Sequence, residues 1–280
     1  MDINKLKSCF DKLEDLDPSD MFAYERALFI FKAIEHLPVF IYTFERTIKI
    51  FRTRTHDTPE RFLKVLDIAN TPRKFVKDFA RCNRPYQSIF YGSENRRTSF
   101  MELIEYWIET KNLGEQLFIT MGLWENTIPI NFIILTTPDK NKRVSQFDKD
   151  YGLAYDNLIK NKSKEEQEYY GFFFKYMFEK FRKPAKNDPR TYIITAAYFN
   201  LAIIEAQGKA DGILYPSVPF EGNGVNLALK DTFAINNLKL TDAIWTQFEV
   251  ALNSINKKDF LESYSIQARS VDRVAGTIEW

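Results

Sequence analysis

The hydrophobic pattern of this chain changes its period several times, and the order of these changes restricts the fold. Spacing typical of amphipathic helices comes first, followed by a strand, a second strand with a helix, two more strands, long helices and several final strands. A protein with regular βαβ repeats would instead alternate strands and helices. The sequence therefore predicts a mixed α+β protein with N-terminal helices and a long central helical segment.

The N-terminal part of the chain begins with two predicted amphipathic helices. Both lie within residues 1–35, and Asp17-Pro18 is expected to start the second. Residues 47–54 read TIKIFRTR, and their alternating β-branched side chains predict a strand. Arg52 should lie near the end of that strand.

The later elements follow from changes of periodicity and from the turn residues between them. We predict a short helix at 59–66, a loop at 69–88, a strand at 87–91, a turn at Gly92-Ser93, a helix at 96–110, and strands at 116–122 and 130–136. Ser163 to Glu166 reads as a capping box for a helix that ends near Arg182. Asp188-Pro189 should start another helix, which Gly208 stops. Short apolar runs then predict strands at 212–217, 225–230 and 232–236.

Composition indicates a packed, globular protein. Of the 280 residues, 45% are hydrophobic and 15% are aromatic, with 25 Phe and 14 Tyr, which excludes a disordered or low-complexity chain. No apolar run approaches the roughly 20 residues that span a bilayer, and the first residues do not resemble a signal peptide. We therefore expect a cytoplasmic protein with no membrane partner.

Cysteine and histidine, which often bind metals or act in catalysis, are scarce in this chain. Cys9 and Cys82 lack CxxC spacing, so both are expected to be reduced, structural thiols. His36 and His56 have no second His or Cys at ligand spacing, and a Ser-His-Asp triad would have to use one of them. Neither a metal site nor such a triad is expected.

Positive charge is concentrated in one part of a chain whose net charge is only +1. Residues 46–97 hold 13 Lys and Arg but 5 Asp and Glu. Such a segment fits a phosphate-bearing ligand, because guanidinium groups bind phosphate in a bidentate manner. A solvated basic surface is the alternative. Nucleic acid is not an expected partner, because no helix-turn-helix, zinc-finger or RNA-binding aromatic motif occurs.

Six short motifs follow one another along the chain. They are Phe51-Arg52-Thr53-Arg54, Ala80-Arg81-Cys82-Asn83, Ile89-Phe90-Tyr91, Thr98-Ser99-Phe100-Met101-Glu102, Gly212-Ile213-Leu214-Tyr215-Pro216-Ser217 and Gly224-Val225-Asn226. Their order and spacing resemble the RES-domain family over roughly residues 47–236. Ala80 and Cys82 stand where that family usually has Gly and a bulky aromatic residue.

The resemblance implies a RES-like catalytic domain at 46–280, with residues 1–45 as an N-terminal helical extension. It implies a mainly antiparallel sheet core similar to that of ADP-ribosyltransferases. It also implies that NAD is the substrate and that its nicotinamide-ribose bond is cleaved by hydrolysis or by inorganic phosphate as co-substrate. Several members of the family are toxins, so a cognate antitoxin protein is an expected partner.

Glu102, Arg52 and Tyr91 are the catalytic residues that the resemblance implies. Cleavage passes through a cationic, oxocarbenium-like ribose, which a carboxylate at Glu102 would stabilise. Arg52 would bind the diphosphate or the attacking phosphate, and Tyr91 would stack on the nicotinamide or ribose. The substrate-binding residues would be Ser217, Arg54, Arg81, Asn83 and Asn226.

Other interpretations of these residues stay open. Without the motif, Glu102 reads as a solvent-facing helical residue, Tyr91 as a packing residue and Ser217 as a turn residue. An ADP-ribosyltransferase that modifies a macromolecule and a non-catalytic RES-like binding protein are the alternative functions.

Overall fold

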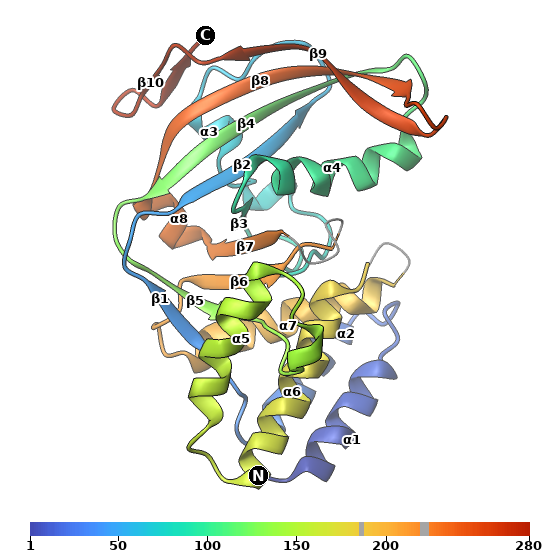
Figure 1. Ribbon diagram of the computed structural model, residues 1–280, viewed down its shortest axis with the longest axis vertical. Coiled ribbons are helices and arrows are strands. Elements are labelled where there is room, and N and C mark those ends of the chain that lie inside the picture. The colour runs from blue at the N-terminus through green and yellow to red at the C-terminus, as the bar shows by residue number, and fades with distance from the viewer. Residues whose placement is uncertain (185–187, 219–223) are drawn as a thin grey trace. The chain divides into compact units, whose positions relative to one another are not determined.

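The computed structural model describes residues 1–184, 188–218 and 224–280 (Figure 1). Within these residues the protein is α+β, with eight α-helices and a nine-strand sheet that is mixed but mainly antiparallel. The chain divides into two compact units, each built from three segments of the sequence. The first unit comprises residues 1–44, 71–89 and 130–230, and the second comprises residues 45–70, 90–129 and 231–280.

The first unit combines helices with four strands. The strands are β1 (Ile41–Phe44), β5 (Ile130–Ile134), β6 (Gly212–Pro216) and β7 (Val225–Lys230), in the order β1-β5-β6-β7. β5 and β6 are parallel, whereas the other neighbours are antiparallel. A parallel pair needs a long crossover. The crossover contains the helices α5 (Gln146–Ile159), α6 (Lys164–Arg182) and α7 (Pro189–Glu205).

Local signals set the ends of the helices in this unit. The predicted capping box is confirmed, because Ser163 and Glu166 each accept the other's backbone N–H. The two N-terminal helices are confirmed as α1 (Ile3–Glu14) and α2 (Ala23–Lys32). The predicted start of the second is wrong, because the Asp17 carboxylate accepts the Ser19 N–H at 2.9 Å and holds a turn instead.

Aromatic side chains fill the core of the first unit. Phe173, Phe174 and Phe181 of α6 are fully buried, as is Tyr198 of α7. The Tyr198 ring lies 5.7 Å from that of Phe173 and 5.9 Å from that of Phe31 on α2. The aromatic stripe of α6 therefore joins three helices by packing.

The second unit is built on antiparallel strands. They are β2 (Lys49–His56), β3 (Ile89–Ser93), β4 (Gln116–Asn126), β8 (Leu238–Leu252) and β9 (Lys258–Gln267), in the order β3-β2-β4-β8-β9. The helix α4 (Arg96–Thr110) lies along this part of the sheet and packs Trp107 against Ile119 and Phe260. The smaller elements are α3 (Val65–Ile68), α8 (Asp231–Asn237) and the paired strands β10 (Ser270–Asp272) and β11 (Thr277–Glu279).

Three further sequence predictions are wrong. Residues 59–64 are not helical, and a helix appears only at the short α3. Residues 232–236 were expected to form a strand but lie in α8. Gly92-Ser93 lies within β3 rather than in a turn. In each case the prediction came from a short segment. A run of only a few residues can fit helical and strand periodicity equally well.

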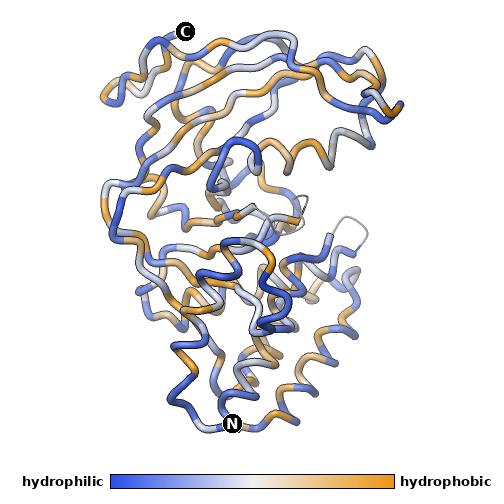
Figure 2. The backbone as a smooth tube through the Cα atoms, in the orientation of Figure 1, coloured by the Kyte–Doolittle hydropathy of each residue, from blue (hydrophilic) through white to orange (hydrophobic). Residues whose placement is uncertain are grey.

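The sequence prediction left the last strands unassigned. β8 has 15 residues and β9 has 10. Hydrophobic and hydrophilic residues alternate along this part of the chain (Figure 2), and β8 alternates buried and more exposed side chains. This period of two was the available signal for β8. Within the described residues, no helix is both long and apolar enough to cross a bilayer.

Candidate functional site

Two arginines on β2 form the most unusual group of charges in the second unit. Arg52 and Arg54 are two positions apart on a strand, so their side chains point to the same face. Arg52 donates from Nε to the Ala69 carbonyl at 3.1 Å and from Nη1 to the Tyr91 carbonyl at 2.5 Å. Arg54 donates from Nη2 to the same Ala69 carbonyl at 2.6 Å. One carbonyl oxygen thus holds both guanidinium groups.

Arg52 is buried and Arg54 is partly buried, and among the described residues neither is paired with a carboxylate. Arg52 is only 6% exposed, and burial lowers its pKa well below the ordinary value, as does the charge of Arg54. Burial lowers the pKa of Arg54 to about 10. Among the described residues, neither forms an ion pair, and the buried Nε of Arg54 has no hydrogen-bond partner. The pair therefore holds positive charge that backbone carbonyls neutralise only in part, which favours binding of an anion.

The structure corrects the predicted position of Arg52. It was expected near the end of its strand, but β2 continues to His56, so Arg52 lies in the middle of the strand. Its guanidinium also lies 5.0 Å from the centre of the Phe90 ring. Arg52 therefore links β2 to β3 and to the residue after α3.

Tyr91 and Glu102 have different relations to this pair. Tyr91 lies on β3, and its carbonyl accepts the Arg52 hydrogen bond. Glu102 is exposed on α4. Ser99 of α4 bonds to Thr53 of β2 at 2.7 Å, so α4 covers the face of the sheet opposite the two guanidinium groups. The second unit therefore brings Arg52, Arg54 and the Tyr91 backbone together, and it places Glu102 over the other face.

The remaining predicted site residues lie in the first unit. Ser217 follows β6 and is fully buried, and its N–H donates to the Gly224 carbonyl at 2.7 Å. Asn226 is buried on β7, where it is paired with Tyr215 of β6. Ser217 therefore lies just after β6, and Asn226 lies on the neighbouring strand β7. Asn83 is also buried, and its side-chain amide donates to the carbonyls of Asp78 and Arg84, both at 3.2 Å.

Arg81 contacts the end of a helix. It donates to the carbonyls of Lys180 at 3.3 Å and Lys183 at 2.8 Å, and its guanidinium lies 5.6 Å from the centre of the Tyr192 ring. The last carbonyls of a helix lack intrahelical donors and carry partial negative charge, which a guanidinium satisfies. In this structure Arg81 caps α6 within the first unit.

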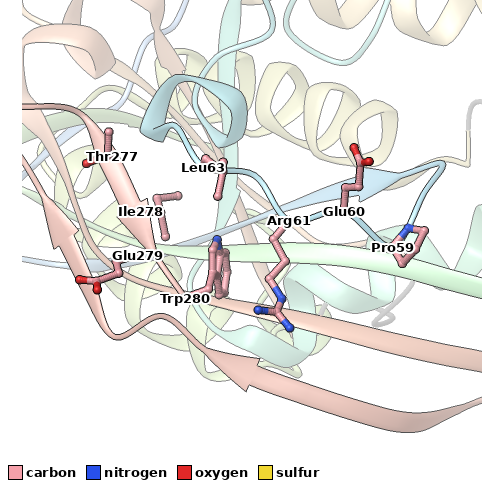
Figure 3. A pocket seen from close by; sticks show the side chains of 8 residues that line it. All are labelled: Pro59, Glu60, Arg61, Leu63, Thr277, Ile278, Glu279 and Trp280. Carbon is pink, nitrogen blue, oxygen red and sulfur yellow. The ribbon is translucent and has the colours of Figure 1, made fainter.

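An open pocket of about 700 Å³ lies in the second unit, and sequence reasoning did not identify it (Figure 3). It is lined by Pro59, Glu60, Arg61, Leu63, Thr277, Ile278, Glu279 and Trp280. The Arg61 guanidinium lies 5.6 Å from the centre of the Trp245 ring and 6.0 Å from that of Trp280. Trp280 Nε1 donates to the Phe62 carbonyl at 2.8 Å. Its walls join segments about 220 residues apart, so no local motif could predict it.

Metal-ligating residues do not cluster in the part of the chain that the structure describes, where no group of three or more His, Cys, Asp or Glu side chains is placed to hold an ion. Cys9 and Cys82 are buried and are not joined to each other by a disulfide. Burial raises the pKa of both thiols, so neither is an activated nucleophile.

Comparison with known proteins gives no further assignment. No protein-family model matches the chain, and a search of curated proteins finds no significant similarity.

Proposed function

We propose that this protein binds NAD and cleaves its nicotinamide-ribose bond, by hydrolysis or by attack of inorganic phosphate. The observation that supports the proposal is the pair of buried guanidinium groups at Arg52 and Arg54, which has no carboxylate partner in the described residues. A diphosphate carries the charge and the acceptor oxygens that such a pair binds. The choice of NAD among diphosphates rests on the sequence resemblance.

Arg52 and Arg54 have different roles in the proposed binding of the diphosphate. Two carbonyls fix the Arg52 guanidinium, which is nearly inaccessible to a ligand. We therefore expect Arg52 to act on a nearby phosphate through its charge and to position Arg54. Arg54 is partly exposed, and its buried Nε has no hydrogen-bond partner among the described residues. We assign the direct phosphate contact to Arg54. The charge of Arg52 strengthens this contact, because water screens a buried charge only weakly.

The cleavage step requires stabilisation of a ribosyl cation as nicotinamide leaves. The leaving group departs neutral, so no second acid is needed to protonate it. The motif assigns the stabilising carboxylate to Glu102 and ring stacking to Tyr91. Because α4 covers the sheet face opposite Arg52 and Arg54, the Glu102 assignment rests on the motif alone and is decided by the Glu102→Gln test below.

A product assay tests the reaction. Purified protein is incubated with NAD, with and without inorganic phosphate, and the products are separated. Nicotinamide with ADP-ribose indicates hydrolysis, and a phosphorylated ADP-ribose that forms only with phosphate indicates phosphorolysis. Transfer of label from NAD to a macromolecule would support an ADP-ribosyltransferase instead. Intact NAD would contradict all three and leave a non-catalytic binding protein.

Glu102→Gln tests the catalytic assignment. Loss of one strong transition-state contact of about 3 kcal/mol should lower turnover roughly a hundredfold. The melting temperature should barely change, because Glu102 is exposed. Glu109→Gln alters an exposed residue of the same helix and serves as the control. Equal turnover in the two variants would remove Glu102 from the proposed site.

The biological role follows from the reaction. Uncontrolled cleavage of NAD would deplete the cytoplasmic pool, so we propose a bacterial toxin or defence effector held in check by an antitoxin protein. Expression in a bacterial host should lower cellular NAD and slow growth. Normal NAD in cells that contain abundant folded protein would contradict this role.

A further inference from the structure

The loop between Pro72 and Tyr86, in the first unit, presents two aromatic rings to solvent. Phe75 is 63% exposed and Tyr86 is 61% exposed. The Lys74 ammonium lies 4.9 Å from the centre of the Phe75 ring, and the Lys77 ammonium lies 4.8 Å from that of Tyr86. Each exposed ring therefore has a cation over one of its faces, at a distance typical of a cation-π contact.

A backbone hydrogen bond brings the two chain segments that carry the rings together. The Tyr86 N–H donates to the Val76 carbonyl at 2.8 Å, so Tyr86 lies next to the residue that follows Phe75. Phe75 itself lies in a 3-10 turn in which its N–H donates to the Pro72 carbonyl at 2.9 Å. Tyr86 also has a φ of 62°, a left-handed conformation that is unfavourable for a bulky residue. The loop keeps this strained backbone although the Tyr86 ring packs little with the core.

The exposed charges of the loop are mainly positive. Arg73, Lys74, Lys77 and Arg84 are exposed, whereas Asp78 is the single exposed acidic side chain between Pro72 and Tyr86. Among the described residues, Lys74 and Lys77 form no ion pair with a carboxylate. The surface thus offers positive charge and two flat rings within 15 consecutive residues.

We propose that this basic aromatic surface, residues 72–86, binds single-stranded nucleic acid. Unpaired bases stack on exposed aromatic rings, while cations beside the rings contact the phosphates that connect the bases. A duplex keeps its bases stacked on each other and cannot use the rings in this way. An acidic peptide would use only the cations, and an anionic membrane would not require two fixed rings.

The proposal does not depend on NAD cleavage. It adds a partner that the sequence did not indicate, because no single-strand-binding motif occurs and the ring exposure is visible only in the fold. A turnover assay therefore cannot decide it, and a binding assay can.

The test is fluorescence anisotropy with labelled single-stranded oligonucleotides, oligo-dT and oligo-U, at low and moderate salt. Phe75→Ser and Tyr86→Asn should each weaken binding about tenfold, the effect of losing one stacked base. Asn tolerates the left-handed conformation at position 86, so the loop geometry is retained. Lys74→Gln and Lys77→Gln should each reduce the slope of log affinity against log salt by about 0.7.

A matched control lies on α6 in the same unit. Lys162 is 4.8 Å from the centre of the Tyr170 ring, but it also pairs with Glu166 at 3.7 Å, and the ring is partly buried and stacks on Phe174. Tyr170→Gln should leave oligonucleotide binding unchanged. No binding to either oligonucleotide, equal affinity for a duplex, or loss of binding in the Tyr170 variant equal to that in Phe75→Ser would overturn the proposal. Equally tight binding of an acidic peptide or of anionic vesicles through the same residues would also overturn it.

Discussion

The two units of the protein differ in the groups that bind their buried cationic side chains. In the first unit, Arg143 has a side chain that is 8% exposed and binds Asp156 through two hydrogen bonds of 2.7 and 2.8 Å. Lys180, 9% exposed, contacts Glu14 at 2.7 Å. In the second unit, Arg52 and Arg54 are bound by carbonyl oxygens alone among the described residues.

The difference separates structural charges from charges held for a ligand. The bond to Asp156 raises the pKa of Arg143, because the carboxylate favours the charged guanidinium. Burial lowers the pKa of Arg52 and Arg54, because no carboxylate offsets the loss of water. A charge that is already neutralised contributes to the fold. A charge that is buried and only partly neutralised favours an incoming anion, which is why the proposed site lies in the second unit.

The largest expected effect concerns Arg52→Met. Methionine fills similar space but removes the charge-assisted bonds to the Ala69 and Tyr91 carbonyls. We expect a loss of about 3 kcal/mol in the free energy of unfolding, since such bonds contribute about 1.5–3 kcal/mol each and relief of the buried charge offsets part of this. Urea denaturation measures it. A more stable variant would show that Arg52 is only a surplus charge, and the contrast between the units would fail.

The next effect concerns ligand-dependent stability. Inorganic pyrophosphate at a hundred times its dissociation constant should raise the free energy of unfolding by about 2.7 kcal/mol. Arg54→Met should abolish this gain, because it removes the partly exposed guanidinium of the pair. Arg143→Met, which removes the neutralised guanidinium of the first unit, should retain it. Thermal unfolding with and without pyrophosphate distinguishes them, and an equal response of the two variants would contradict the assignment of the anion site.

A smaller effect is expected when the first unit loses its ion pair. Arg143→Met leaves Asp156 with Lys140 at 3.5 Å as its remaining cation. Because Asp156 is partly exposed, water also compensates its charge. We expect a loss of about 2 kcal/mol by urea denaturation. No loss would mean that the pair contributes nothing to the fold, contrary to the comparison.

The smallest effect concerns pH. The hydrogen bond from Arg143 lowers the pKa of Asp156 below its ordinary 3.8. The folded state therefore favours the ionised form, and this stability is present above pH 3.8 and is lost as the pH falls through the lowered value. The free energy of unfolding should fall less on acidification in Asp156→Asn than in the unmodified protein, by under about 1 kcal/mol. Denaturation between pH 2 and 6 measures the slope, and identical slopes would show that the pair does not control it.

Local signals predicted many of the elements correctly. The capping box at Ser163, the Pro189 start of α7 and the helix α4 depend on residues within a few positions of one another, so the sequence displays them directly. The short run at 232–236 could not be assigned in this way, because five residues fit a strand or a helix and contacts with the rest of the unit decide between them.

The candidate site was predicted in part. The sequence indicated that Arg52 and Arg54 lie on a strand, and the structure places them on β2. It could not show that the basic segment at 46–97 is divided between two units, with Arg73, Lys74, Lys77, Arg81 and Arg84 in the first. Nor could it show that α4 places Glu102 over the face opposite the guanidinium groups.

By itself, the sequence determined where positive charge and aromatic residues are concentrated and which helices carry their own caps. The tertiary structure decided which charges are buried and what binds them. Arg52 bonds to carbonyls 17 and 39 positions away, and Arg81 bonds to a carbonyl 99 positions away. Such partners come from the backbone, which every residue possesses, so no residue type in the sequence marks them. Only folding selects the carbonyl that each guanidinium meets.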